Sequence, residues 1–219
     1  MRTANRPCRP LRDVCYWGWL SLVMLLTGCS VVPAQRHWRQ LGATPPSQFL
    51  ADDDAVLRGV RPIEMRVGQN TTVRIEHRDP VVVRNGASSY VRLFRFHAVD
   101  RGVYRATVEA WCDCPWTAVL WGEPEFPVFY PGLVVLDARG MRMMPTSEDV
   151  VHRQPILTAT WVKGVWEVNL SDAGPYFLMI TSQHHGPTVV GSAGKIAVHV
   201  SSPVGKVRVG IERVGELSQ

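Results

Sequence analysis

Residues 104–114 read Tyr-Arg-Ala-Thr-Val-Glu-Ala-Trp-Cys-Asp-Cys, and their alternation decides the fold that we expect. Successive side chains of a β-strand point to opposite faces, so apolar residues at every second position indicate one buried and one solvated face. The apolar positions are Tyr104, Ala106, Val108 and Ala110, and the polar positions between them are Arg105, Thr107 and Glu109.

Short apolar and β-branched runs, separated by Gly, Pro, Asn and Asp, continue on both sides of this stretch. This spacing is typical of all-β proteins, and pairs such as Asn85-Gly86 and Ala173-Gly174 mark turns between strands. The expected strands are residues 64–67, 71–77, 81–83, 90–98, 103–111, 133–136, 156–161, 165–170, 176–181, 196–200 and 206–211.

Half-buried strands need a second layer to cover their apolar faces. We therefore expect residues 60–219 to form an all-β domain, a two-layer antiparallel β-sandwich that is jelly-roll-like. A domain of this size buries enough apolar surface to fold without disulfide staples.

The N-terminus has the three-part pattern of an export signal. Four arginines precede a mainly apolar centre from Val14 to Leu26, and small residues precede Cys29. That centre is shorter than the roughly 20 residues that span a bilayer. The sequence Leu26-Thr27-Gly28-Cys29 resembles the bacterial lipobox. An ordinary cleaved signal and an uncleaved anchor are the alternatives.

The lipobox resemblance implies that residues 1–28 are a lipoprotein signal peptide and that Cys29 carries diacylglycerol and acyl groups. Residues 29–59 then form a spacer, rich in Pro, Gln and Asp, between the membrane and the domain. In Gram-negative lipoproteins an Asp after the cysteine commonly marks retention at the inner membrane. Ser30 occupies that position here, which implies the periplasmic face of the outer membrane.

The charge of the mature chain argues against a nucleic-acid partner. Residues 1–28 hold four of the 24 basic and one of the 19 acidic residues, which leaves 20 against 18. The mature part is almost neutral, so the excess of basic residues in the whole chain does not indicate nucleic-acid binding. Because no second apolar segment approaches spanning length, membrane attachment is expected through the lipid.

Cys112 and Cys114 are the two cysteines that remain after Cys29 and the signal. In an exported protein such a pair is expected to be a disulfide. Two residues of extended strand span roughly 6.6 Å between Cα atoms, the outer limit for a disulfide. Either the chain bends at Asp113 or the thiols stay apart. A zinc site needs two further ligands, and redox chemistry needs a nearby cation; we expect neither a metal nor a redox role.

Trp111, Trp116 and Trp121 surround a Pro-containing loop that also holds Glu123. Aromatic rings beside carboxylates stack on sugar faces, so these four residues are candidates for binding a glycan. The alternative is that the large aromatics supply core area or brace a long loop.

Arg92 and Arg95, on the expected strand 90–98, face either an anionic partner or simply solvent. The chain lacks the Gly-x-Ser-x-Gly nucleophile motif and a glycine-rich phosphate loop. We therefore expect no enzyme activity, no catalytic residue and no cofactor beyond the lipid on Cys29.

Five segments carry a resemblance to known families: residues 86–96, 126–131, 133–137, 174–180 and 202–209. In this order they resemble the maltose operon periplasmic protein family, and also the wider class of pre-peptidase C-terminal β-sandwich modules. The resemblance implies an exported β-sandwich and a link to carbohydrate transport, and it implies no catalytic residues.

The sequence thus predicts a non-enzymatic, lipid-anchored periplasmic envelope protein with an accessory or binding role, linked to maltose-type transport. Its partner is an unidentified envelope protein or glycan. Two alternatives remain, a glycan- or peptidoglycan-binding module and a scaffold subunit of an envelope secretion machine.

Overall fold

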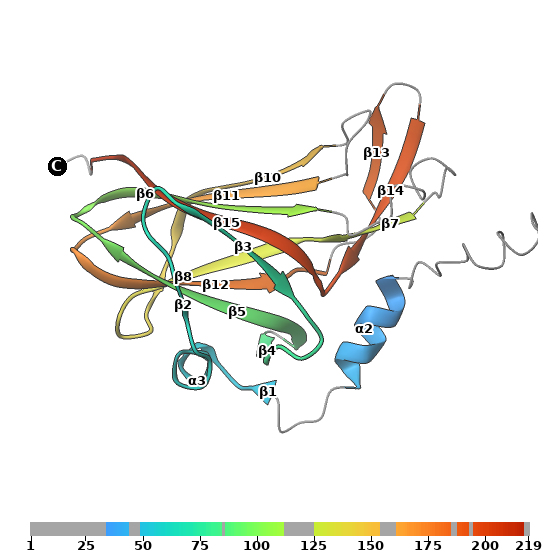
Figure 1. Ribbon diagram of the computed structural model, residues 1–219, viewed down its shortest axis with the longest axis horizontal. Coiled ribbons are helices and arrows are strands. Elements are labelled where there is room, and N and C mark those ends of the chain that lie inside the picture. The colour runs from blue at the N-terminus through green and yellow to red at the C-terminus, as the bar shows by residue number, and fades with distance from the viewer. Residues whose placement is uncertain are drawn as a thin grey trace, which may run out of the picture. The chain divides into compact units, whose positions relative to one another are not determined.

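The computed structural model shows two β-sheets stacked face to face (Figure 1). All residues that the structure describes belong to the unit Pro33–Gln219. The long strands pair antiparallel within both sheets. The described residues are 34–43, 49–84, 86–111, 125–153, 161–184, 188–192 and 195–216.

One sheet, called here the covered sheet, has the strand order β1-β4-β5-β12-β8-β9, and β2 pairs with β5. The short strands β1 and β2 pair parallel with their neighbours. The bounds are β1 Phe49–Leu50, β2 Ile63–Glu64, β4 Val81–Arg84, β5 Ala87–Ala98, β8 Pro131–Leu136, β9 Arg142–Met143 and β12 Gly174–Ser182.

The other sheet, called here the open sheet, has the strand order β10-β11-β6-β15-β3. A smaller sheet at one end of the sandwich has the order β13-β14-β7 (Figure 1). The bounds are β3 Asn70–Ile75, β6 Gly102–Trp111, β7 Glu125–Phe129, β10 Pro145–Arg153, β11 Trp161–Leu170, β13 Thr188–Ser192, β14 Lys195–Ser202 and β15 Gly205–Gly215.

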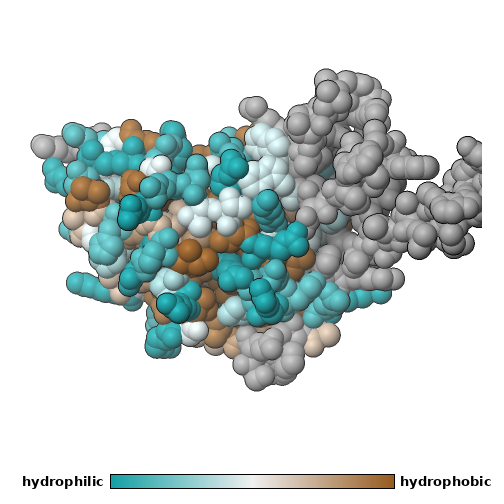
Figure 2. Space-filling view, viewed as in Figure 1, coloured by the Kyte–Doolittle hydropathy of each residue, from teal (hydrophilic) through white to brown (hydrophobic). Residues whose placement is uncertain are grey.

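The core lies between the two sheets. Phe96 of the covered sheet contacts Tyr104 of the open sheet, with ring centroids 6.2 Å apart, and stacks on Tyr176 of its neighbouring strand at 5.9 Å. Gly164 leaves room for the buried Trp166, because a Cβ at Gly164 would lie 2.0 Å from that indole. Figure 2, in the same view, shows hydrophobic residues in the middle of the described part, bordered at the top by hydrophilic ones.

Helix α3 (Asp53–Gly59) covers the outer face of the covered sheet. Its N-cap, Asp52, accepts a hydrogen bond from the backbone N–H of Ala55 at 2.7 Å. Its Val56 is fully buried in a second apolar cluster that includes Val91 and Met179 of the sheet below. Both faces of the covered sheet are therefore packed.

Helix α2 (Ala34–Gly42) packs on the sandwich through its last two turns. The indole N–H of Trp38 donates a hydrogen bond to the carbonyl oxygen of Ser201 at 2.8 Å, and Leu41 is 2% exposed. Both helices fall within residues 29–59, so part of the expected spacer packs onto the domain. No helix in the part of the chain that the structure describes is long and apolar enough to cross a membrane.

The all-β, two-layer antiparallel expectation is confirmed. The predicted alternation is also confirmed, since Tyr104, Ala106, Val108 and Ala110 are buried while the residues between them are half-buried. Of the expected strand 156–161, the structure describes Trp161, the first residue of β11. Strands β1, β7, β9, β10 and β13 were not anticipated from the sequence.

Candidate binding face

The outer face of the open sheet carries the most organised cluster of polar side chains among the described residues. Strand register aligns its residues in rows that run across the strands. The central row is Asn70, Gly210, Thr107 and Val165. One flanking row is Arg208, Glu109 and Lys163, and the other is Glu212, Arg105 and Glu167.

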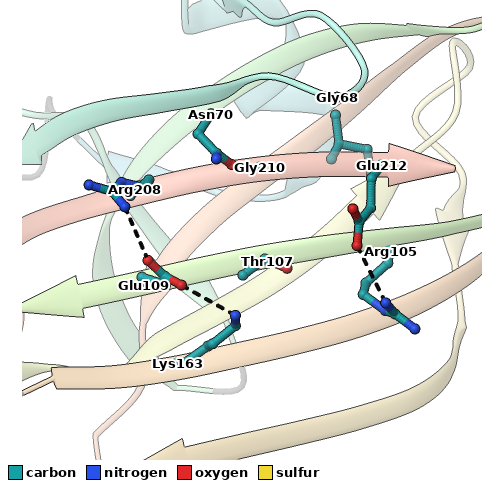
Figure 3. Close-up of a pocket in the computed structure, with 10 residues that line it drawn as sticks. Gly68, Asn70, Arg105, Thr107, Glu109, Lys163, Arg208, Gly210 and Glu212 are labelled. Carbon is teal, nitrogen blue, oxygen red and sulfur yellow. Dashed lines mark hydrogen bonds and ion pairs between the residues drawn. The ribbon is translucent and has the colours of Figure 1, made fainter. Parts of the chain in front are cut away.

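The central row forms the floor of a trough. Thr107 has a short side chain, so the sheet surface is low at β6 between the two charged rows, and Asn70 lies over the neighbouring Gly210 (Figure 3). A Cβ at Gly210 would lie 2.2 Å from Oδ1 of Asn70, which shows that the missing side chain lets Asn70 lie over this strand. The depression has a volume of about 240 Å³.

Each charged row is an internal network of ion pairs. In the first row, Glu109 lies 3.3 Å from Lys163 Nζ and 3.6 Å from Arg208 Nη1 (Figure 3). In the second, Arg105 lies 2.8 Å from Glu167 Oε1 and 3.4 Å from Glu212 Oε1. The hydrogen bond to Glu167 raises the pKa of Arg105. These rows remain accessible, since the side chains of Arg105 and Arg208 are 40% and 48% exposed.

Two tryptophans and two basic residues form the next row beyond the first charged row, in the order Arg74, Lys206, Trp111 and Trp161. Trp111, a residue singled out from the sequence, is half-buried and stands opposite Trp161 of β11 in the register. The guanidinium carbon of Arg208 lies 4.9 Å from the centre of the Trp111 ring, a cation–π contact. The aromatic end of the face is thereby joined to the charged row.

The other site residues predicted from the sequence lie outside the described residues. They are Cys29, Cys112, Cys114, Trp116, Trp121 and Glu123. The lipid on Cys29, the disulfide and the glycan-binding loop therefore stay predictions.

The structure gives both arginines of the strand 90–98 a partner within the chain. Arg92 Nη2 lies 2.6 Å from the buried Asp79, and Arg95 Nη2 lies 2.7 Å from Glu64. Burial raises the pKa of Asp79, although hydrogen bonding and Arg92 oppose the rise.

Arg95 is 43% exposed and fits the solvated-face interpretation. Arg92 instead lies on the same side of β5 as the buried Tyr90, and its Nη2 donates a hydrogen bond to the backbone carbonyl of Arg74 in β3 at 3.3 Å. Arg92 therefore connects the two sheets and does not face solvent.

A buried carboxylate ties α3 to the covered sheet. Asp53 bonds Arg84 of β4 through Oδ1 and Arg142 of β9 through Oδ2, both at 2.5 Å. Burial alone would raise the pKa of Asp53, but the hydrogen bonds from the two arginines outweigh it and lower the pKa below the ordinary value of 3.8. This cluster is structural, because it fastens the helix that covers the sheet.

Sequence reasoning found the solvated face of β6 but not the trough. Arg105, Thr107 and Glu109 were recognised as outward-facing, whereas Lys163 and Gly210 come from strands more distant in the sequence. Alternation identifies the face of one strand, but the register that aligns three strands is not readable from it. No group of three His, Cys, Asp or Glu able to hold a metal was found among the described residues.

No family model and no curated protein matches this chain. Among solved structures, the chain is similar to the pre-peptidase C-terminal domain of collagenase from Bacillus anthracis. The likeness covers 69% of this chain and 95% of that chain, with 6% sequence identity and a TM-score of 0.27. The β-sandwich therefore rests on the strands described above, and the resemblance to the maltose operon family stays a prediction.

Proposed function

We propose that this protein is a non-enzymatic, lipid-anchored envelope protein whose β-sandwich serves binding. A lipobox-like Leu26–Cys29 sequence precedes a domain that leaves one sheet face accessible. The accessible face carries this proposal, because its charged side chains pair with one another in two rows on either side of the short Thr107. Such a surface suits recognition of a partner.

The anchor is proposed at Cys29, with the domain on the periplasmic face of the outer membrane. The role is an accessory one, linked to maltose-type carbohydrate transport, and it is supported by the resemblance to the maltose operon periplasmic proteins. Two or more acyl chains hold a protein stably at a membrane, where a single chain holds it only marginally.

Metabolic labelling with radioactive palmitate tests the anchor. We expect the wild-type chain and Cys112→Ala to incorporate the label, and Cys29→Ala to lose it. Cys112→Ala is the matched control, because it removes a cysteine outside the lipobox. Equal labelling of Cys29→Ala and wild type, or no labelling of wild type, would contradict the anchor.

Crosslinking in intact cells tests the role. A photo-reactive residue at Val165, in the central row of the open face, is expected to give no dominant protein adduct if this face binds a glycan. A single dominant heavy adduct would instead support the scaffold of a secretion machine. The same residue at Glu64, on the covered sheet, is the control position.

A further inference from the structure

We propose that the trough on the open sheet binds a neutral, hydroxyl-rich glycan chain. This inference rests on the proposed function, since it names the ligand class of a binding face on an envelope protein. It also moves the site from the predicted loop with Trp116, Trp121 and Glu123 to the sheet surface between Glu109 and Arg105.

The size of the trough fits one unit of a longer chain. Its volume of about 240 Å³ is below the roughly 300–1,000 Å³ that is usual for sites enclosing a whole small molecule. The trough lies on the accessible outer face of the sheet, with charged side chains on both sides and Thr107 on its floor (Figure 3). A chain of repeating units is thus able to place one unit in the trough.

The charges of the two rows cancel. The row of Arg208, Glu109 and Lys163 has two positive charges and one negative charge, and the opposite row has the reverse. The lining of the trough itself has three positive side chains and two negative ones, so a polyanion meets repulsion as well as attraction there. This balance favours a neutral ligand over an acidic polymer.

Hydroxyl groups match the paired side chains. A hydroxyl donates one hydrogen bond and accepts others, whereas a carboxylate only accepts and a guanidinium only donates. A sugar hydroxyl beside Glu109 and Arg208 is able to donate to the first and accept from the second without separating them. Hydrogen bonds to charged groups are the stronger ones, and here the two charged groups already lie beside each other, 3.6 Å apart.

The tryptophan row supplies an apolar surface at one side of the trough. Trp111 and Trp161 are half-buried and adjacent in the register, next to the row of Glu109. Indole rings offer a large apolar area with a polar N–H, which suits the mixed surface of a sugar ring. The two tryptophans lie outside the lining of the trough, so a glycan in the trough reaches this aromatic surface where it extends across the row of Glu109.

Isothermal titration of the full chain with maltoheptaose and with chitohexaose tests this proposal. The protein is kept in an amine-oxide detergent, because detergents with sugar headgroups would compete. We expect at least one of the two neutral glycans to bind, with affinity nearly independent of salt. Glu109→Gln should weaken that binding about tenfold, as expected for loss of a charged hydrogen-bond partner.

Glu64→Gln is the matched control, since Glu64 is an exposed carboxylate that pairs with Arg95, and both residues belong to the covered sheet. It should bind as wild type does. Thr107→Lys, which fills the floor, should abolish binding while the thermal unfolding curve stays cooperative.

Three results would overturn the proposal: no heat with either neutral glycan, equal weakening by Glu109→Gln and Glu64→Gln, or salt-sensitive binding of polygalacturonate in place of the neutral chains. Because titration in detergent does not depend on the anchor, its outcome is separate from that of palmitate labelling. Failure of one experiment therefore leaves the other interpretable.

Discussion

The outer faces of the two sheets are built in opposite ways. On the covered sheet, Val91 and Met179 point outward and are buried beneath Val56 of α3. On the open sheet, the corresponding outward positions of β6 are Arg105, Thr107 and Glu109, and they remain partly exposed. One outer face therefore contributes to stability by apolar burial, whereas the other keeps its polar side chains accessible, as the proposed binding role requires.

Matched lysine substitutions give the largest expected contrast between the two faces. Met179→Lys would bury an ammonium group beside Arg84, whose Nη2 lies 3.2 Å from the Met179 sulfur, and we expect a loss of more than about 4 kcal/mol in the free energy of unfolding. Thr107→Lys adds a charge to a solvated face and should cost less than about 1 kcal/mol. Urea denaturation of both variants measures the difference. Similar losses would show that the open face is also packed.

Asp53 tests how firmly α3 is held. Asp53→Asn removes the charge that Arg84 and Arg142 share, and we expect a loss of about 2–3 kcal/mol at neutral pH. Because the folded-state pKa of Asp53 is lowered, its contribution is present above the ordinary value of 3.8 and is lost as the pH falls through the folded-state value. The unfolding free energies of wild type and variant should therefore converge below about pH 4.

The control for that experiment is Glu64→Gln, because Glu64 is an exposed carboxylate on the covered sheet that also forms an ion pair with an arginine. Its stability at neutral pH should lie within about 0.5 kcal/mol of wild type. If Asp53→Asn is as harmless as Glu64→Gln, α3 is not fastened to the sheet by this cluster.

Trp38→Phe probes the attachment of α2 with the smallest expected effect. The substitution keeps the aromatic ring but removes the hydrogen bond to the Ser201 carbonyl, and we expect a loss of about 1 kcal/mol. The urea midpoint measures this loss, with Arg39→Lys on the exposed side of the same helix as control. Unchanged midpoints for both variants would show that the indole N–H contributes nothing to docking.

The sequence predicted the fold where the pattern of burial is visible in one strand. Alternation in β6 gave the inner face, from Tyr104 to Ala110, correctly. Strand β10 was missed because most of its described side chains, including Glu148 and Asp149, are exposed and show no apolar alternation. A strand without a buried face has no apolar alternation from which the sequence could predict it.

Two features were harder to predict from the sequence: the helix α3 that covers the covered sheet, and the trough on the open sheet. The continuous apolar run of Phe177, Leu178 and Met179 is typical of a strand packed on both faces, yet it does not say which element covers it. The trough depends on pairing Gly210 with Thr107, and this register is set by packing between segments about 100 residues apart.

Backbone amide chemical shifts during titration with the neutral glycan test the central claim most directly, namely that the outer face of the open sheet is the binding face. We predict that the perturbed amides include Thr107 and Gly210, while those of Val91 and Met179 under α3 stay unchanged. Perturbations centred on α3 and the covered sheet, or none at a glycan concentration that saturates binding, would contradict it.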